Sequence, residues 1–376
     1  PYPAKELSGC GVGFKLLQAY SQRYGLPLET LYTYLDLVAV SIACDIVPIV
    51  GENRVLAYHG LQQLNKAPRP GLLALMQLGN LCPPLSIADL VFGLGPRINA
   101  AGRIDHARLA VELLLAPDAR TAQGLAQAIN EKNTLRRDVD SAMTAEALAM
   151  ITAQQRSKRT TVLFKEDWHK GVVGIVASRC IEQYYRPTVI LTAAKGKATG
   201  SARSVVGYNV YQAIAACSDL LDQYGGHAAA AGLTLPVENV PAFQQRFEAV
   251  VAQSISNELL IPRQQVDLPL SLEKITLKFY RVLKQMAPFG TGNMRPVFMT
   301  DQVVAKSYTT IKDKHLKLYI AHPGVPHVFE AIGFGLAHCA PLVQAQQPFR
   351  MAYTLEENDY RGEGCLQLNI KDLQRA

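Results

Sequence analysis

One uninterrupted segment in the middle of the chain most constrains its fold. From Gly124 to Gln155 the apolar residues have helical spacing, and this segment contains no glycine or proline after Gly124. At about 1.5 Å per residue, such a helix would extend about 45 Å. Because the middle of the segment is polar, we expect a helix that connects two domains, and we assign residues 111–157 to the connecting helices.

The sequence around this segment follows three further patterns. Residues 10–110 show successive helical patterns separated by glycine and proline, whereas residues 160–255 alternate between strand and helix patterns, as in an α/β layer arrangement. After Ile261 the patterns are mostly short strands with a turn about every ten residues, which is typical of a five-stranded nucleic-acid-binding barrel. The sequence therefore predicts a multidomain α/β protein with domains at 1–110, 158–258 and 259–376 in addition to the connecting helices.

Composition excludes several classes of protein. With 376 residues, 49% of them hydrophobic, and a net charge of +7, the chain can bury about two or three cores and favours an anionic partner. No segment is a polybasic tail, so nucleic acid would have to be bound in a shaped groove. The seven scattered cysteines lack C-x-x-C spacing, which argues against a zinc site or disulfide framework and favours a cytoplasmic location. No apolar run approaches the roughly 20 residues of a membrane helix, so we predict no membrane association.

Common enzyme signatures are missing from the sequence. The segment GCGVGF lacks the spacing and preceding strand of a dinucleotide-binding loop, and the chain has no Walker lysine, G-x-S-x-G or H-E-x-x-H motif. Oxidoreductase and NTPase functions are therefore disfavoured. The chain begins Pro1-Tyr2-Pro3, without a methionine or a charged and apolar leader, which we interpret as part of a longer protein.

Asp45 is the first candidate functional residue. It lies in VSIACDIVPI with apolar residues on both sides, so the sequence predicts a buried carboxylate. Burial of an unpaired charge is costly, and a metal cation, a basic side chain or backbone amides could compensate it. Asp36, in the same apolar segment, is a weaker candidate that we expect to face solvent or an arginine.

A second candidate is the segment GLGPRINAAGRIDHARL. We expect Arg97, Asn99 and Arg103 to lie in a loop of small residues just before a helix. Guanidinium and amide groups among small neighbours suit phosphate or carboxylate binding. The alternative is a helix-capping loop with two surface arginines.

A third candidate is the pair of segments GSARSVVGYNV and QYGGHAAAAGLTL. Arg203 and Ser204 are expected at a turn from a strand into a helix, where side-chain donors and the helix N-terminus favour an anion. We expect a second helix to end at Tyr224, so that Gly225 and Gly226 present free N–H groups.

In that arrangement His227 would donate to a phosphate oxygen, and the small residues up to Gly232 would let the ligand approach the backbone. The alternative is a Gly-Gly helix stop followed by a buried strand, with His227 hydrogen-bonded internally.

Taken together and in this order, the segments resemble the RecJ single-strand DNA exonucleases of the DHH phosphoesterase superfamily. The resemblance spans nearly the whole chain, with one departure at Met294, where the family tends to have proline. The aspartate motifs and the Asp-His-His motif that normally precede PAKELSG do not occur here. The matching segments are PAKELSGCGVGF, LDLVAVSIACDIVPI, PRINAAGRI, WHKGVVGIVASR, GSARS, GGHAAAAG, MAPFGTGN, HLKLYI, AIGFG and LEENDYRGEGCLQLNIKD.

The resemblance implies a fold and a set of site residues. The expected domains are the helical remainder of a DHH domain, the long connecting helix, an α/β DHH-associated (DHHA1) domain and a C-terminal OB-fold-like β-barrel. By this comparison Asp45 matches a metal-ligating aspartate. The residues that match DNA-facing or phosphate-binding positions are Arg97, Asn99, Arg103, Arg203, Ser204, Gly225, Gly226, His227 and Gly232.

The resemblance also implies a reaction. The expected activity is 5′ to 3′ hydrolysis of single-stranded DNA in repair and recombination, with two Mn²⁺ or Mg²⁺ ions held by Asp45 and by ligands upstream of residue 1. We expect a monomer, inactive alone, whose partners are single-stranded DNA, a single-strand-binding protein and a repair helicase. The alternatives are a phosphodiesterase acting on oligonucleotides or cyclic dinucleotides, a tRNA-editing type of GGH module, and a non-catalytic DNA-binding relative.

Four aromatic residues alternate on the expected barrel strands: Tyr319, Phe329, Phe334 and Tyr353. They could stack on bases of a single strand, or they could form the core of the barrel.

Overall fold

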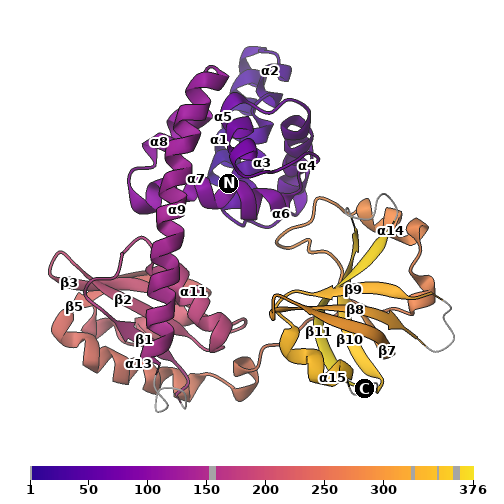
Figure 1. Cartoon of the computed structure of the whole chain (residues 1–376). Helices are drawn as coiled ribbons and strands as arrows, with labels where there is room; N and C mark the ends of the chain where they lie inside the picture. The colour runs from indigo at the N-terminus through magenta and orange to yellow at the C-terminus, as the bar shows by residue number, and fades with distance from the viewer. Residues whose placement is uncertain (1, 152–157, 323–326, 345–346, 359–364) are drawn as a thin grey trace. The chain divides into compact units, whose positions relative to one another are not determined.

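The protein forms two compact units. The computed structural model describes residues 2–151, 158–322, 327–344, 347–358 and 365–376 (Figure 1). None of the helices in these ranges combines the length and apolar character needed to cross a membrane. Unit 1 consists of Pro1–Ala67, Pro83–Val91 and Arg263–Ala376, and unit 2 consists of Pro68–Cys82 and Phe92–Pro262.

The first part of unit 1 is helical, as predicted. Ser8 accepts a hydrogen bond from the Gly11 amide at the start of α1, and Gly25, with φ of 64°, ends that helix. Helix α3 packs on α4 at Gly60, where a β-carbon would lie 2.2 Å from the Leu35 carbonyl oxygen. The helices are α1 (Gly9–Tyr24), α2 (Glu29–Tyr32), α3 (Leu35–Cys44), α4 (Gly51–Lys66) and α6 (Ile87–Asp89).

The second part of unit 1 is the predicted barrel. Its strands close in the order β7-β8-β9-β11-β10-β7, with β9 and β11 parallel and the other neighbours antiparallel. This is a five-stranded barrel of the OB type. The elements are β6 (Leu268–Pro269), α14 (Leu277–Lys284), β7 (Phe298–Ile311), β8 (His315–Ala321), β9 (Phe329–Gly333), α15 (Ala340–Gln344), β10 (Phe349–Glu357) and β11 (Leu366–Arg375).

The segment that leads into the barrel is attached to the helices of unit 1. The Ile49 amide donates to the Thr291 carbonyl oxygen at 2.6 Å, and Arg54 Nη2 donates to the Met286 carbonyl oxygen at 2.9 Å. A β-carbon at Gly290 would lie 2.5 Å from Ile49 Cδ1, so the Ile49 side chain packs directly on the Gly290 backbone. Unit 1 therefore joins the helices and the barrel in one packed body.

The four aromatic residues of the barrel have different environments. Tyr353 is fully buried, its hydroxyl lies 2.9 Å from Thr300 Oγ1, and burial raises its pKa to about 12. Phe329 packs partly buried against the barrel core. Phe334 is 59% exposed, and the Lys317 ammonium lies 5.7 Å from the Tyr319 ring centre. Tyr353 is thus core, whereas Phe334 is exposed and Tyr319 is half-buried.

The helical part of unit 2 is organised by the long helix that the sequence predicts. Asp118 caps its start by accepting from the Thr121 amide at 2.9 Å. Figure 1 shows α9 running from α7 and α8 to the sheet of the same unit. The end of the predicted helix, residues 152–155, lies outside the described residues. The helices are α5 (Pro70–Leu78), α7 (Gly95–Ile104), α8 (Arg108–Leu114) and α9 (Ala119–Met150), with a π-helical turn at Leu90–Leu94.

The rest of unit 2 is an α/β layer, as predicted. Its five-stranded sheet has the order β1-β2-β3-β5-β4, with β1 and β2 parallel and the other pairs antiparallel. The elements are β1 (Thr161–Phe164), α11 (Val173–Gln183), β2 (Thr188–Ala194), β3 (Lys197–Arg203), α12 (Val210–Ala215), β4 (Gln223–His227), β5 (Ala230–Pro236) and α13 (Val240–Ser254).

One predicted element in this layer is wrong. The helix expected to end at Tyr224 ends at Ala215 instead, and Tyr224 lies in the edge strand β4. Two adjacent glycines disfavour a helix, and pairing with β5 provides partners for the extended backbone.

The barrel core gives the first testable prediction. Tyr353→Ala should lower the free energy of unfolding by about 3–5 kcal/mol, because it empties a fully buried aromatic site. Phe334→Ala, the exposed control, should change it by less than about 0.5 kcal/mol. Urea denaturation of the purified chain measures both, and similar losses in the two variants would contradict the assignment of Tyr353 to the core.

Candidate functional site

Arg97, Asn99 and Arg103 lie in helix α7, so the prediction of a loop is wrong. Pro96 occupies the first turn and Ala100 is fully buried, which favours a helix despite the small residues. Arg97 donates to the Gly93 carbonyl oxygen at 2.6 Å and to Asn130 Oδ1 of α9 at 3.2 Å. Asn99 and Arg103 are exposed and four residues apart, so they share one face of the helix.

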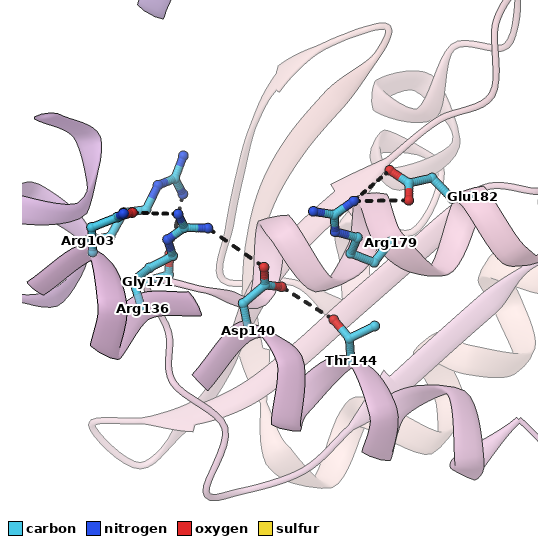
Figure 2. Close-up of polar contacts among 8 residues, drawn as sticks. Arg103, Arg136, Asp140, Thr144, Gly171, Arg179 and Glu182 are labelled. Carbon is cyan, nitrogen blue, oxygen red and sulfur yellow. Dashed lines mark hydrogen bonds and ion pairs between the residues drawn. The ribbon is translucent and has the colours of Figure 1, made fainter. Parts of the chain in front are cut away.

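The end of α7 packs against the turn that precedes α11. Arg103 Nη1 donates to the Gly171 carbonyl oxygen at 3.3 Å (Figure 2). A β-carbon at Gly171 would lie 2.2 Å from the Arg103 carbonyl oxygen, so only glycine permits this approach. The contact brings the exposed face of α7 next to the α/β layer of the same unit.

Arg203 lies at the end of β3 beside the start of α11. Its Nη1 donates to Ser201 Oγ at 2.6 Å and to the Ala202 carbonyl oxygen at 2.8 Å. Its Nη2 lies 2.8 Å from the position of a β-carbon on Gly174, in the first turn of α11. Burial, and then the charge of Arg103, lower the pKa of the Arg203 guanidinium. A guanidinium and a helix N-terminus therefore lie together, as an anion site requires.

The turn between β4 and β5 presents His227. The His227 Nδ1 accepts a hydrogen bond from the Ala229 amide at 3.3 Å, so a neutral ring carries its proton on Nε2. His227 is exposed rather than buried, although the bond to the Ala229 amide is an internal hydrogen bond of the kind that the alternative expected. Ser204 holds the turn through its amide, which donates to the Ala229 carbonyl oxygen at 3.0 Å, while its hydroxyl donates to the Tyr208 carbonyl oxygen at 2.7 Å.

Beside this turn, part of the sheet surface carries no side chains, and we call it the glycine patch. Gly225 of β4 pairs with Gly232 of β5, which pairs in turn with Ser201 of β3. A β-carbon on Gly225 would have no neighbour within 4 Å. A cavity of about 660 Å³ opens over this patch, with Lys170 among its lining residues. The absence of side chains on these glycines leaves the surface of the sheet open at this point, and the binding of a phosphate here stays a prediction.

Three arginines that the sequence analysis did not single out lie near these residues. Arg136 and Arg137 lie on α9 and Arg179 lies on α11. The pKa of Arg136 is lowered by burial and by Arg103, Arg137 and Arg179, and that of Arg97 is lowered by burial and by Arg137. We call the set the arginine cluster; it consists of Arg97, Arg103, Arg136, Arg137, Arg179 and Arg203.

Two carboxylates contact the arginine cluster. Asp140 Oδ2 lies 3.7 Å from Arg136 Nη1, and Glu182 Oε2 lies 3.2 Å from Arg179 Nη1 (Figure 2). The adjacent arginines in LRRD, in the polar middle of a predicted helix, were the one signal in the sequence that could have indicated this cluster.

Asp45 lies in unit 1, where the prediction of a buried carboxylate is wrong. It is exposed at the C-terminal cap of α3, and its Oδ2 accepts from Ser41 Oγ at 3.0 Å. In this segment the buried carboxylate is Asp36, which is 1% exposed and accepts from the Leu37 amide, so Asp36 does not face solvent and the alternative of a neighbouring arginine stays a prediction. Helix α3 ends at Cys44, one residue before Asp45, which places that side chain beyond the packed helix.

The described residues do not make up a complete metal site. No group of three or more His, Cys, Asp and Glu side chains among them could hold a metal ion. Asp45 offers one accessible carboxylate, which is a suitable single ligand for a hard cation, but a two-metal site needs several more.

Sequence comparisons connect the chain to known proteins. The RecJ OB domain family matches residues 266–372, and the DHHA1 domain family matches residues 157–253. The chain is 35% identical to the single-stranded-DNA-specific exonuclease RecJ of Bacillus subtilis over 99% of this chain and 47% of that protein. It is 33% identical to the RecJ of Salmonella typhimurium over 99% of this chain and 68% of that protein.

Comparison of the fold with solved structures also finds RecJ proteins. RecJ of Thermus thermophilus in complex with Mn²⁺ matches with a TM-score of 0.86 at 29% identity, over 100% of this chain and 54% of that chain. The same protein in complex with Mg²⁺ matches with a TM-score of 0.85 at 28% identity, over 100% of this chain and 57% of that chain. The chain thus spans about half the length of the Bacillus subtilis and Thermus thermophilus proteins.

The glycine patch gives a testable prediction about backbone geometry. Gly226 has φ of 147°, and a β-carbon there would lie 2.3 Å from the Ala230 carbonyl oxygen. Gly226→Ala should therefore lower the free energy of unfolding by more than about 1 kcal/mol. Gly225→Ala, where the space is open, should change it by less than about 0.5 kcal/mol. Thermal unfolding distinguishes the two variants, and equal stability of both would contradict the described β4–β5 pairing.

Proposed function

Because this chain belongs to the RecJ family of single-stranded-DNA-specific exonucleases, we propose that it supplies the phosphate-binding part of an enzyme that hydrolyses single-stranded DNA in the 5′ to 3′ direction. The observation that carries the proposal is the arginine cluster of unit 2, which gathers six guanidinium groups against two carboxylates. Such a surplus of positive charge favours a polyanion.

The proposed ligand is the sugar-phosphate chain near the scissile bond. Arg203 and the start of α11 would bind one phosphate, with Asn99 and Arg103 on the adjacent face of α7. Their contribution is orientation and charge stabilisation of the phosphodiester rather than proton transfer.

His227 and the glycine patch would bind the same strand. With Nδ1 occupied by the Ala229 amide, the outward Nε2–H is free to donate to a phosphate oxygen. Gly225 and Gly232, which line the cavity, would let the strand approach the backbone. Gly226 would support this site by permitting the close β4–β5 contact, since a β-carbon there would lie 2.3 Å from the Ala230 carbonyl oxygen. Ser204 would act by holding the turn that carries His227, because its own hydroxyl proton is already donated to Tyr208.

The proposed cofactor is Mn²⁺ or Mg²⁺, with Asp45 as one ligand. Carboxylate oxygens suit these hard cations. When bound, such ions lower the pKa of an attacking water and stabilise charge on the phosphate oxygens. Because Asp45 is a single ligand, the proposal requires that the remaining ligands come from the half of the RecJ length that this chain does not match.

The barrel would bind the strand without base specificity. In OB folds the second and third strands form the usual oligonucleotide surface, and these correspond to β8 and β9. Tyr319 on β8, with the Lys317 ammonium near its ring, and the exposed Phe334 just after β9 offer stacking surfaces beside a cation.

The cellular setting follows from the same resemblance and remains part of the proposal. We place the protein in the cytoplasm as a monomer active in DNA repair and recombination. Its proposed protein partners are a single-strand-binding protein and a repair helicase.

The metal role of Asp45 is tested in a protein that contains this chain and spans the full length of RecJ. Asp45→Ala should abolish Mn²⁺-dependent or Mg²⁺-dependent degradation of single-stranded DNA, because a metal ligand is lost. Its melting temperature should change little, since Asp45 is exposed and its side chain has one hydrogen bond here. Glu112→Ala, which removes an exposed carboxylate on α8, is the matched control. Undiminished degradation by the Asp45 variant would reject the metal role.

DNA binding is tested with the chain by itself and a fluorescent dT oligonucleotide. We expect binding without cleavage, since one carboxylate cannot hold the metal pair. His227→Ala should weaken binding several-fold, about 1 kcal/mol for one phosphate hydrogen bond, with little loss of melting temperature. His59→Ala, an exposed histidine of unit 1, is the control. Metal-dependent cleavage by the isolated chain, or a large loss of stability with unchanged binding in the His227 variant, would contradict these roles.

A further inference from the structure

Arg136 is held in place more firmly than a surface arginine. Its side chain is 12% exposed, and its Nη2 donates to Asn133 Oδ1 at 2.7 Å. On the other side, Asp140 Oδ2 lies 3.7 Å from Nη1, and Asp140 Oδ1 in turn accepts from Thr144 Oγ1 at 3.3 Å. Three residues of the same helix, at spacings of three or four, therefore fix the Arg136 guanidinium before any ligand binds. Figure 2 shows the Arg136–Asp140–Thr144 part of this chain of contacts.

The charge around Arg136 is not balanced by these contacts. Arg103, Arg137 and Arg179 all lie close enough to repel its positive charge, and they lower its pKa together with burial, which is the largest cause. Among the residues that the structure describes, Asp140 is the carboxylate that opposes this effect on Arg136. Arg179 pairs with Glu182, but that pair is more than half exposed and is screened by solvent. An anion would relieve this repulsion.

We propose that Arg136 and Arg179 form a second phosphate subsite, which binds an internal phosphodiester of the DNA strand, and that Asp140 is the residue that positions Arg136 for it. The subsite consists of residues on α9 and α11, whereas the resemblance assigns phosphate binding to residues on α7, β3 and β4. The inference rests on the proposed function, because the ligand is the same single strand.

The chemistry of the subsite fits a phosphodiester. A guanidinium presents a planar fork of donors that matches two phosphate oxygens, and a preorganised fork loses little entropy on binding. The contact reads no base, so the subsite should add affinity and salt dependence without sequence preference. The Asp140 carboxylate would keep the Arg136 side chain in this conformation despite repulsion by the other arginines of the cluster.

The first experiment measures binding of a fluorescent dT12 oligonucleotide to the purified chain at several salt concentrations. Arg136→Ala should weaken binding by about tenfold or more and reduce the slope of log K against log salt by about 0.7, the value for one single-strand phosphate. Arg179→Ala should act in the same direction with a smaller loss. Arg120→Ala, an exposed arginine in the first turn of the same helix, should leave affinity and slope unchanged.

The role of Asp140 is tested by the sign of its effect. Asp140→Ala removes a negative charge, so a purely electrostatic role predicts tighter binding of dT12. A positioning role predicts weaker binding, by about threefold or more, with partial rescue in Asp140→Asn, which keeps one acceptor oxygen. Binding by Asp140→Ala that is as tight as that of the unmodified chain would overturn the positioning role. If this variant does not fold, Asp140→Asn decides the same question, because it removes the charge and keeps one acceptor oxygen. Positioning requires binding no tighter than that of the unmodified chain, and tighter binding overturns it.

The outcomes separate the subsite from the proposed function. If the unmodified chain does not bind dT12, the proposed function fails. If it binds and both Arg136→Ala and Arg179→Ala retain full affinity and an unchanged salt slope, the second subsite is rejected while the proposed function stands.

Discussion

The arrangement of unit 2 depends on one continuous helix. Helix α9 packs against α5, α7 and α8 near its start and against α11 further along, and it has no glycine or proline after Gly124. Asn130 of α9 holds Arg97, and the close contact between Arg103 and Gly171 joins the end of α7 to the turn before α11. Because α9 cannot bend easily between these contacts, side chains from distant parts of the sequence keep fixed positions in one cluster.

Packing several arginines together opposes folding unless something compensates it. Burial removes water from Arg136 and Arg203, and each also feels the charge of Arg103. Hydrogen bonds to backbone carbonyls and to Asn130, Asn133 and Ser201 satisfy donors but carry no negative charge. Local conflicts of this kind are expected where a protein binds a charged ligand. The RecJ relatives are named as exonucleases of single-stranded DNA, and that strand is the ligand that we propose.

The sequence predicted most of the fold because its periodic patterns are strong. The long helix and the barrel strands were confirmed, since each depends on many residues that agree with one another. The predictions failed where one or two residues determine the local structure. Gly225 and Gly226 were interpreted as a helix stop, but they pair with β5 in an edge strand. Asp45 was expected to be buried because of its neighbours, yet the helix ends just before it.

The missed part of the site has a different cause. Arg136 lies in LRRD and Arg179 ends the segment WHKGVVGIVASR, but neither pattern predicts a contact between the two residues. Their proximity results from the packing of α11 against α9, which no spacing in the sequence encodes. The central claim is therefore that this packed surface of unit 2 binds the phosphates of a single strand. Photo-crosslinking of the chain to a dT12 oligonucleotide that carries iodouracil, followed by peptide mapping, tests it most directly. The account predicts crosslinked peptides from 95–104, 133–140 and 223–232 in addition to the barrel, and crosslinks confined to the barrel would contradict it.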